Sequence, residues 1–134
     1  MPRLYREAPV NSIWEGAGNI MCLDVLRAVG RTPDIADVLR RELDAGGDTR
    51  LRSFSAALFE QLAAAERNDE AQARALVRDL VLALQAALLI KHSPPAVADA
   101  FCASRLSEGR GGAFGTLPRG VDARTIAERA APQG

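Results

Sequence analysis

The chain has 134 residues, of which 48% are hydrophobic and 4% aromatic, and its 17 basic and 17 acidic residues give a formal net charge of zero. This length fits one domain, and the apolar content excludes a wholly disordered chain. The balanced charge disfavours a strongly basic nucleic-acid-binding protein. Alanine and leucine dominate the apolar residues, which favours helices over strands because neither loses much side-chain freedom in a helix.

Six segments have the apolar spacing or the start and stop residues of helices. Pro2 and Pro9 interrupt the first 14 residues, which we expect to be irregular. Thr32, Pro33 and Asp34 have the residue types of a helix start, with threonine as N-cap and proline in the first turn. The expected helices cover residues 16–30, 32–46, 48–68, 69–91, 96–106 and 121–131.

The segment 69–91 is the longest of these and is apolar around much of its circumference. A helix of this kind packs on two sides, so it is expected at the centre of the fold. The sequence therefore predicts an all-α protein, an antiparallel bundle of about five to six helices. The apolar stripe comprises Ala73, Leu76, Val77, Leu80, Val81, Leu84, Ala87 and Leu88, widened by Leu82 and Leu89.

The two cysteines, Cys22 and Cys102, stand outside any Cys-x-x-Cys pair, which favours buried free thiols over a disulfide framework. The first residues lack the apolar core of a secretory signal. The longest apolar stretch, residues 80–90, is shorter than the roughly 20 residues needed to span a bilayer. We therefore expect a cytoplasmic protein with no membrane partner.

Few residues suggest chemistry by their type and spacing. His92 is the single histidine, and no group of residues has the spacing of metal ligands, so neither a histidine-activated nucleophile nor a metal site is expected. The glycine-rich stretch 109–120 lacks the Lys-Ser/Thr ending of a phosphate-binding loop and is typical of a flexible connection.

A nucleic-acid interface is a second hypothesis, because residues 71–134 carry three more basic than acidic side chains. An excess of this size is also ordinary scatter. Clustering of the C-terminal arginines on one face would favour phosphate contacts, whereas dispersal would favour a structural, packing role. The candidate residues are Arg27, Arg105, Arg110, Arg119 and Arg124.

Glu15 stands out among the acidic residues. It lies between the single tryptophan, Trp14, and a run of small residues at the start of an expected helix. An acid beside an aromatic ring, followed by glycines that expose backbone N–H groups, is one way to hold a perturbed carboxylate beside an oxyanion site. Alternatively, Glu15 only stabilises the positive end of the helix.

The stretch from Tyr5 to Asn19 resembles the motif that precedes the last helix of the acyl-CoA dehydrogenases. In that family an Arg-Asp/Glu-Ala run is followed by Ile-Tyr-Glu-Gly-Thr, and residues 6–8 and 13–17 match it at the same spacing. The form of the motif in this chain resembles that of one branch, the alkylation-response, AidB-like proteins. It reads Tyr-Arg-Glu-x-Pro-Val-Asn-Ser-Ile-Trp-Glu-Gly. Residues 23–27, 101–106 and 115–118 continue the resemblance.

The resemblance implies roles for three residues. Glu15 matches the base that removes the α-proton of an acyl-CoA while FAD accepts the hydride, and its backbone N–H matches a contact to the thioester carbonyl. Ala17 stands where the family has a threonine whose hydroxyl bonds to FAD, so only backbone contact is expected there. Asn19 matches a polar position that reaches FAD.

The resemblance also implies a longer protein. The family's N-terminal helical domain and β-domain would precede residue 1, so this chain would be the C-terminal helical part with an extension. Residues 1–31 would belong to the core bundle and residues 32–134 to an additional helical domain, which is associated with DNA binding in this branch. We expect FAD, acyl-CoA and homo-oligomerisation in the longer protein, and neither FAD binding nor turnover by this chain alone. The alternatives are a duplex-DNA-binding, protective module and an oligomer-packing helical domain.

Overall fold

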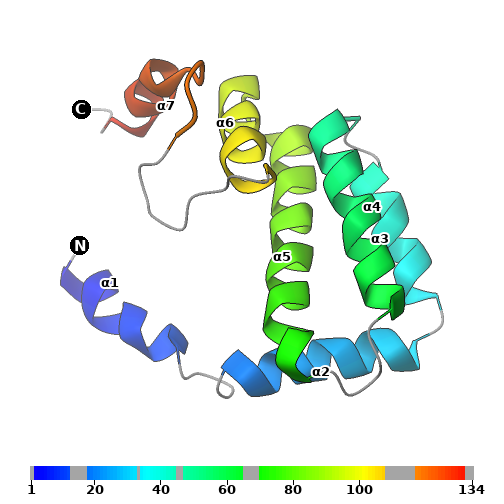
Figure 1. The fold of residues 1–134 in the computed structure, drawn as a ribbon. Helices are drawn as coiled ribbons and strands as arrows, with labels where there is room; N and C mark the ends of the chain where they lie inside the picture. Colours follow the sequence, from blue (N-terminus) through cyan, green and yellow to red (C-terminus); the bar gives the residue numbers. More distant parts are fainter. Residues whose placement is uncertain are drawn as a thin grey trace.

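The structure, a computed structural model, describes residues 2–12, 18–32, 34–44, 47–64, 70–107 and 117–131, and every regular element in these ranges is helical (Figure 1). The expected all-α class is confirmed. The elements are α1 (Pro2–Glu7), the 3₁₀ helix η1 (Ala8–Ser12), α2 (Gly18–Arg31), α3 (Ile35–Asp44), α4 (Thr49–Ala64), α5 (Glu70–His92), α6 (Pro95–Arg105) and α7 (Ala123–Ala130).

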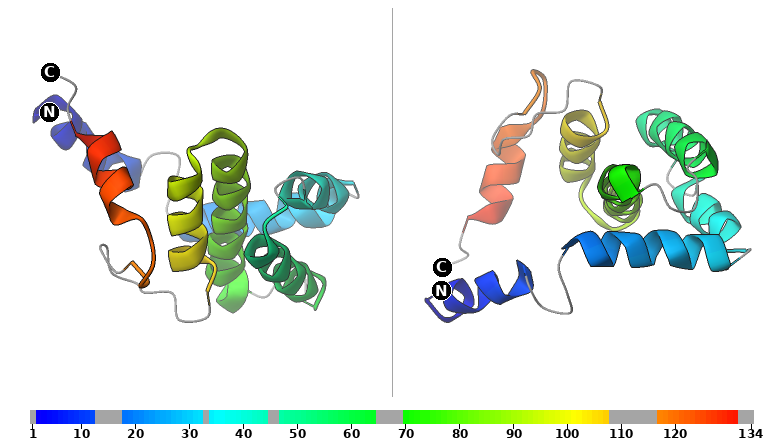
Figure 2. Two further views of the ribbon diagram at one scale, coloured as in Figure 1. Left: turned by 90° about the horizontal axis from the view of Figure 1, so that it is seen from above. Right: turned by 60° about the horizontal axis from the view of Figure 1, so that its bottom comes forward.

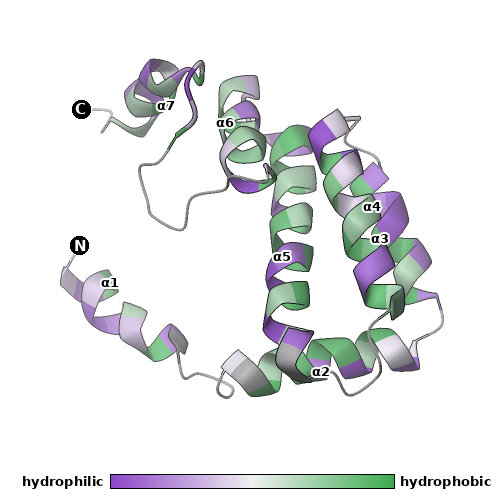
Figure 3. Ribbon diagram, viewed as in Figure 1, coloured by the Kyte–Doolittle hydropathy of each residue, from purple (hydrophilic) through white to green (hydrophobic). Residues whose placement is uncertain are grey.

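Helices α3 to α6 alternate in direction, so the expected antiparallel bundle is present (Figure 1). Helix α5 contacts α2, α3, α4 and α6, which confirms its central position. Helix α2 does not run along the bundle but passes across its base, as the view from another side also shows (Figure 2). Hydrophobic residues predominate along α2, where it lies beneath α5 (Figure 3).

The core is built on one side of α5. Leu76 and Leu80 are 2% and 6% exposed, and they pack with buried leucines of α3 and α4. The apolar stripe predicted for α5 is wider than the face that α5 buries, since Val81 and Leu88 are 45% and 50% exposed. Four neighbouring helices do not enclose the whole circumference of α5, so the residues on its outer side meet water. Small side chains make up much of the buried surface of α5 and α6: Ala73, Ala83, Ala86, Ala87, Ala98 and Ala100.

The expectation of an irregular N-terminus was wrong. Residues 2–7 form α1 and residues 8–12 form η1. Pro2 is the first residue of α1, where the N–H that proline lacks would have no helical partner. An ion pair between Arg3 Nε and Glu7 Oε1, at 2.9 Å, joins successive turns. Helix α1 buries none of its residues, and both views place α1 and η1 away from the bundle (Figures 1 and 2).

The helix ends follow from local chemistry. The backbone N–H of Ile35 donates to the carbonyl of Thr32 at 3.2 Å, so the chain turns at the expected start of α3, although Pro33 lies outside the described residues. Pro95 opens α6. Asp122 caps α7 by accepting a hydrogen bond from the backbone N–H of Thr125 at 3.0 Å, as expected for an acid at a helix N-terminus.

Candidate functional site

The segment singled out by sequence is only partly described. Glu15 and Ala17 lie in residues 13–17, outside the described ranges, and of Asn19 only the backbone, in the first turn of α2, is described. Their roles therefore stay predictions. The described flanks are η1, which ends at Ser12, and α2, which begins at Gly18.

A hollow of about 430 Å³ lies where α2 begins beside α5, next to that segment in the sequence. Val77 and Val81 give it an apolar wall, and Arg74 and Arg78 bring guanidinium groups. Arg78 Nε donates to Asp79 Oδ1 at 2.8 Å, and this hydrogen bond raises the pKa of Arg78. The arginines of α5 therefore border the surface from which α2 starts.

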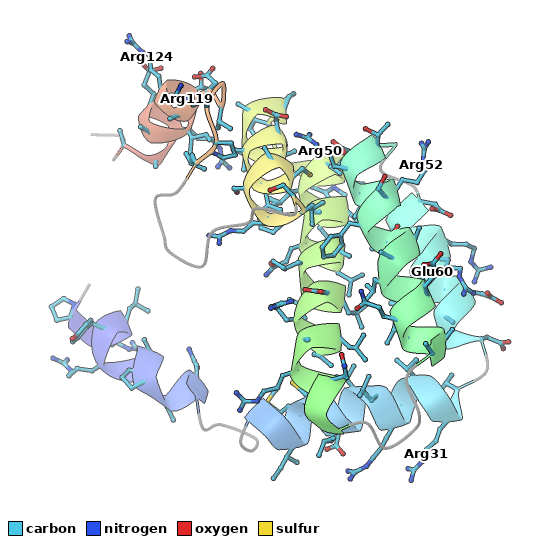
Figure 4. The ribbon with its side chains drawn as sticks, viewed as in Figure 1. Arg31, Arg50, Arg52, Glu60, Arg119 and Arg124 are labelled. Atoms are coloured by element: carbon cyan, nitrogen blue, oxygen red, sulfur yellow. The ribbon has the colours of Figure 1, made fainter. Side chains whose placement is uncertain are left out.

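The structure does not bring the candidate nucleic-acid residues to one place. Arg27 lies on α2, where its Nη1 pairs with Asp24 Oδ1 at 2.8 Å, whereas Arg119 and Arg124 lie near and on α7 (Figure 4). Arg105 is in the last turn of α6 and is partly buried. Arg110 lies outside the described residues. A single basic face formed by all the candidates is therefore not observed, and DNA contact stays a prediction.

An ion-pair cluster that the sequence analysis did not anticipate joins α4 to α6. Arg50 Nη2 pairs with Asp48 Oδ2 at 2.7 Å, and Arg50 Nη1 pairs with Asp99 Oδ1 at 2.8 Å. Asp48 also precedes α4 and accepts the backbone N–H of Arg50 at 2.8 Å. Side-chain hydrogen bonding to Arg50 holds the pKa of Asp48 below its ordinary 3.8. Arg50 lies where the upper ends of α4 and α6 approach each other (Figure 4).

A second bridge lies between α3 and α5, where Lys91 Nζ contacts Glu42 Oε1 at 2.5 Å. Like the pair between Arg50 and Asp99, it joins residues 49 positions apart in the sequence. These separations explain why neither bridge was foreseen: helix-period reasoning identifies partners three or four residues apart.

A larger hollow, about 500 Å³, lies between α4, the middle of α5 and the end of α6. We call it the α4–α5–α6 hollow; its walls include Phe54, Leu58 and Leu106, with Arg50 and Asp79 among its charged residues. Asp79 is 9% exposed and lies on the central helix α5. A buried acid requires a partner, and the neighbouring Arg78 supplies one at 2.8 Å.

The described ranges hold no group of three or more His, Cys, Asp or Glu side chains arranged to bind a metal ion. They also contain no helix with both the length and the apolar character needed to cross a bilayer.

Comparison with known proteins shows the family to which the chain belongs, which the geometry of the described residues does not show. Over 113 residues, 84% of its length, the chain is 39% identical to "Putative acyl-CoA dehydrogenase AidB" of Escherichia coli (strain K12). The chain is an AidB-like member of the acyl-CoA dehydrogenase family. It spans about one fifth of that relative's length, 20%. No family model matches the chain, and no solved structure matches it.

The AidB-like relationship confirms the family inferred from the Tyr5–Asn19 motif. It does not by itself place a cofactor, because Ala17 and the side chain of Asn19 are outside the described residues. The fit of FAD to this chain therefore rests on the family motif.

Proposed function

We propose that this chain supplies the catalytic base, Glu15, of a flavin-dependent acyl-CoA dehydrogenase within a longer AidB-like polypeptide. The observation that carries the proposal is the 39% identity to a protein named as a putative acyl-CoA dehydrogenase, together with the motif around Glu15. The matched stretch covers 20% of that relative, which is therefore about five times longer than the stretch.

The role of Glu15 comes from the family motif, and the neighbouring Trp14 is compatible with it. The carboxylate would remove the α-proton of an acyl thioester, and its backbone N–H would donate to the thioester carbonyl. A carboxylate beside the Trp14 indole and an apolar acyl chain loses solvation, which raises its pKa toward the working pH and makes it a better base. FAD, when bound, supplies the hydride acceptor.

The exposed N-terminal arm supports a longer polypeptide. Leu4 and Tyr5 on α1 are 65% and 82% exposed, and Ile20 and Met21 at the start of α2 are 54% and 50% exposed. Large apolar side chains exposed along one part of a chain favour a surface that another part of the protein covers. We propose that residues 1–31 pack with the family's core bundle and that residues 32–134 form the additional helical domain, although α2 also contacts α5.

The same exposed arm favours a second candidate function, an oligomer-packing helical domain. Such a domain would use the apolar residues of α1 and α2 to join copies of the longer protein. In that case the removal of Glu15 basicity would leave the function of the chain unchanged.

The proposal is tested in the longer protein with Glu15→Gln, which keeps the shape of the side chain and removes its basicity. We expect the rate of acyl-CoA dehydrogenation to fall by about 10²–10⁴-fold. Glu60→Gln is the matched control: Glu60 is an exposed acid of α4, outside the motif, and its replacement should leave the rate within about twofold of wild type.

Two further measurements separate the candidates. Flavin absorbance should show equal FAD content in wild type and Glu15→Gln, so that a rate loss reports the base and not the cofactor. Unchanged turnover in Glu15→Gln would refute the base assignment. A wild-type protein that turns over no acyl-CoA but binds duplex DNA with a steep salt dependence would instead establish the nucleic-acid function.

A further inference from the structure

The hollow where α2 begins beside α5 is large enough to hold a small molecule. We call it the α2–α5 hollow. Its volume of about 430 Å³ lies within the range of roughly 300–1,000 Å³ that is usual for ligand pockets. Two residues of α2 and five of α5 line it: Gly18, Cys22, Arg74, Val77, Arg78, Val81 and Leu82.

The charged side chains that line this hollow are both basic. Arg74 and Arg78 are four residues apart on α5, a spacing that brings two side chains to the same face of a helix. The neighbouring acid, Asp79, lines the α4–α5–α6 hollow instead. A concave surface lined by charge of one sign attracts the opposite charge, so this lining favours an anion.

The guanidinium group of Arg78 is accessible to a ligand. Its side chain is 56% exposed, and Arg74 is also an exposed residue. The hydrogen bond from Arg78 to Asp79 Oδ1, at 2.8 Å, uses the N–H on Nε, and a guanidinium carries four more N–H donors on its two terminal nitrogens. Donors in this planar arrangement match the two oxygens of a carboxylate.

The rest of the lining on α5 is apolar. Val77, Val81 and Leu82 form this wall, and Val81 is 45% exposed. A ligand with an apolar chain would remove this surface from water, which is favourable. The lining therefore combines basic groups for an anionic head with an apolar wall for a short chain.

We propose that the α2–α5 hollow binds a small organic anion, a carboxylate with a short apolar chain. The carboxylate contacts Arg74 and Arg78, and the chain lies along Val77, Val81 and Leu82. This inference does not depend on the dehydrogenase proposal, because its test measures binding and no turnover.

The test uses Cys22 as a reporter of the hollow. Cys22 lines the hollow and is partly exposed, whereas Cys102 exposes no surface. The rate at which iodoacetamide alkylates Cys22 in the full 134-residue chain is measured by mass spectrometry at neutral pH and constant ionic strength, with increasing hexanoate. We expect protection that saturates, because a bound ligand covers the thiol.

Hexylamine is the matched control ligand, since it has the same chain length and the opposite charge. It should need a concentration about tenfold higher or more to give the same protection. Protection by hexanoate that does not saturate, or equal protection by the two ligands, would overturn the proposal.

Three arginine variants locate the anionic head, each compared with its own rate without ligand. Arg74→Gln and Arg78→Gln should each raise the half-protecting hexanoate concentration by about threefold to fivefold, the scale of an exposed ion pair. Arg52→Gln makes the same change at an exposed arginine of α4 outside the lining (Figure 4), and it should leave that concentration unchanged. Equal effects in all three variants would refute the location.

A pair of apolar variants locates the chain. Val81→Ala removes part of the apolar wall and should weaken protection by hexanoate, whereas Leu88→Ala, at an exposed position of the same helix outside the lining, should not. If Arg78→Gln fails to fold by circular dichroism, Arg74→Gln and Val81→Ala decide. Weaker protection in both supports the site, and unchanged protection in either refutes it.

Discussion

The Leu80→Ala substitution tests whether α5 is the centre of the core. Leu80 is 6% exposed and belongs to the main buried cluster. The substitution removes three carbon atoms, each worth about 0.8 kcal/mol of transfer free energy when buried. The residual cavity adds to this cost, so we expect a loss of about 3 kcal/mol in the free energy of unfolding, within the range of about 2–5 kcal/mol for such changes.

Leu88→Ala is the matched control, since it is the same substitution on the same helix at a side chain that is 50% exposed. It changes helix propensity by the same amount as Leu80→Ala and differs mainly in burial. We expect it to cost less than about 0.5 to 1 kcal/mol. The difference between the two variants therefore isolates the contribution of the core.

The assay is urea unfolding monitored by far-ultraviolet circular dichroism, which reports the helices directly. The midpoint should fall for Leu80→Ala while the slope stays equal to that of wild type, because the unfolded surface changes little. A thermal melt should fall by roughly 10 °C, at about 3–4 °C for each kcal/mol in a domain of this length. Equal midpoints for the two variants would refute the central position of α5.

Three other outcomes follow from local contacts. Hydrogen bonding to Arg50 lowers the pKa of Asp48, so in acid the folded state binds fewer protons than the unfolded state. Stability should therefore be lost as the pH falls below 3.8. Urea midpoints measured across pH should show a weaker pH dependence for Asp48→Asn than for wild type. Asp122→Ala removes the N-cap of α7 and should lower the helical circular dichroism signal slightly. An unchanged amide-exchange rate in α7 would contradict the capping role. Cys102 is fully buried and burial raises the pKa of its thiol, so Cys22, which is partly exposed, should react first with a thiol reagent at pH 8, as peptide mass mapping would show.

Sequence reasoning predicted the bundle because its signals are local. The apolar period located α5 to within one or two residues at each end, and Asp122 marked the start of α7. It missed α1 because proline breaks a helix only beyond the first turn, and Pro2 stands in the first turn of α1 while Pro9 lies in η1. It also overestimated the buried face of α5, since periodicity counts apolar residues and does not show how many helices will surround them.

The candidate site was less accessible to sequence reasoning. The role assigned to Glu15 comes from the family motif, and a lone acid beside a tryptophan would not identify a base without it. The cluster of Asp48, Arg50 and Asp99 depends on helices that meet only after folding. The α4–α5–α6 hollow has the same origin, because its walls come from three separate elements.

The buried alanines of α5 and α6 determine which substitutions this chain tolerates during evolution. At Ala83, Ala86 and Cys102, none of which exposes any surface, added methyl groups would force neighbouring helices apart and cost about 1–3 kcal/mol. At the buried leucines the opposite change, trimming, is the costly one. Homologues should therefore vary freely in charge on the outer sides of these helices but keep the residue volume at the buried positions. A larger side chain at a buried position should occur together with a smaller one on the facing helix.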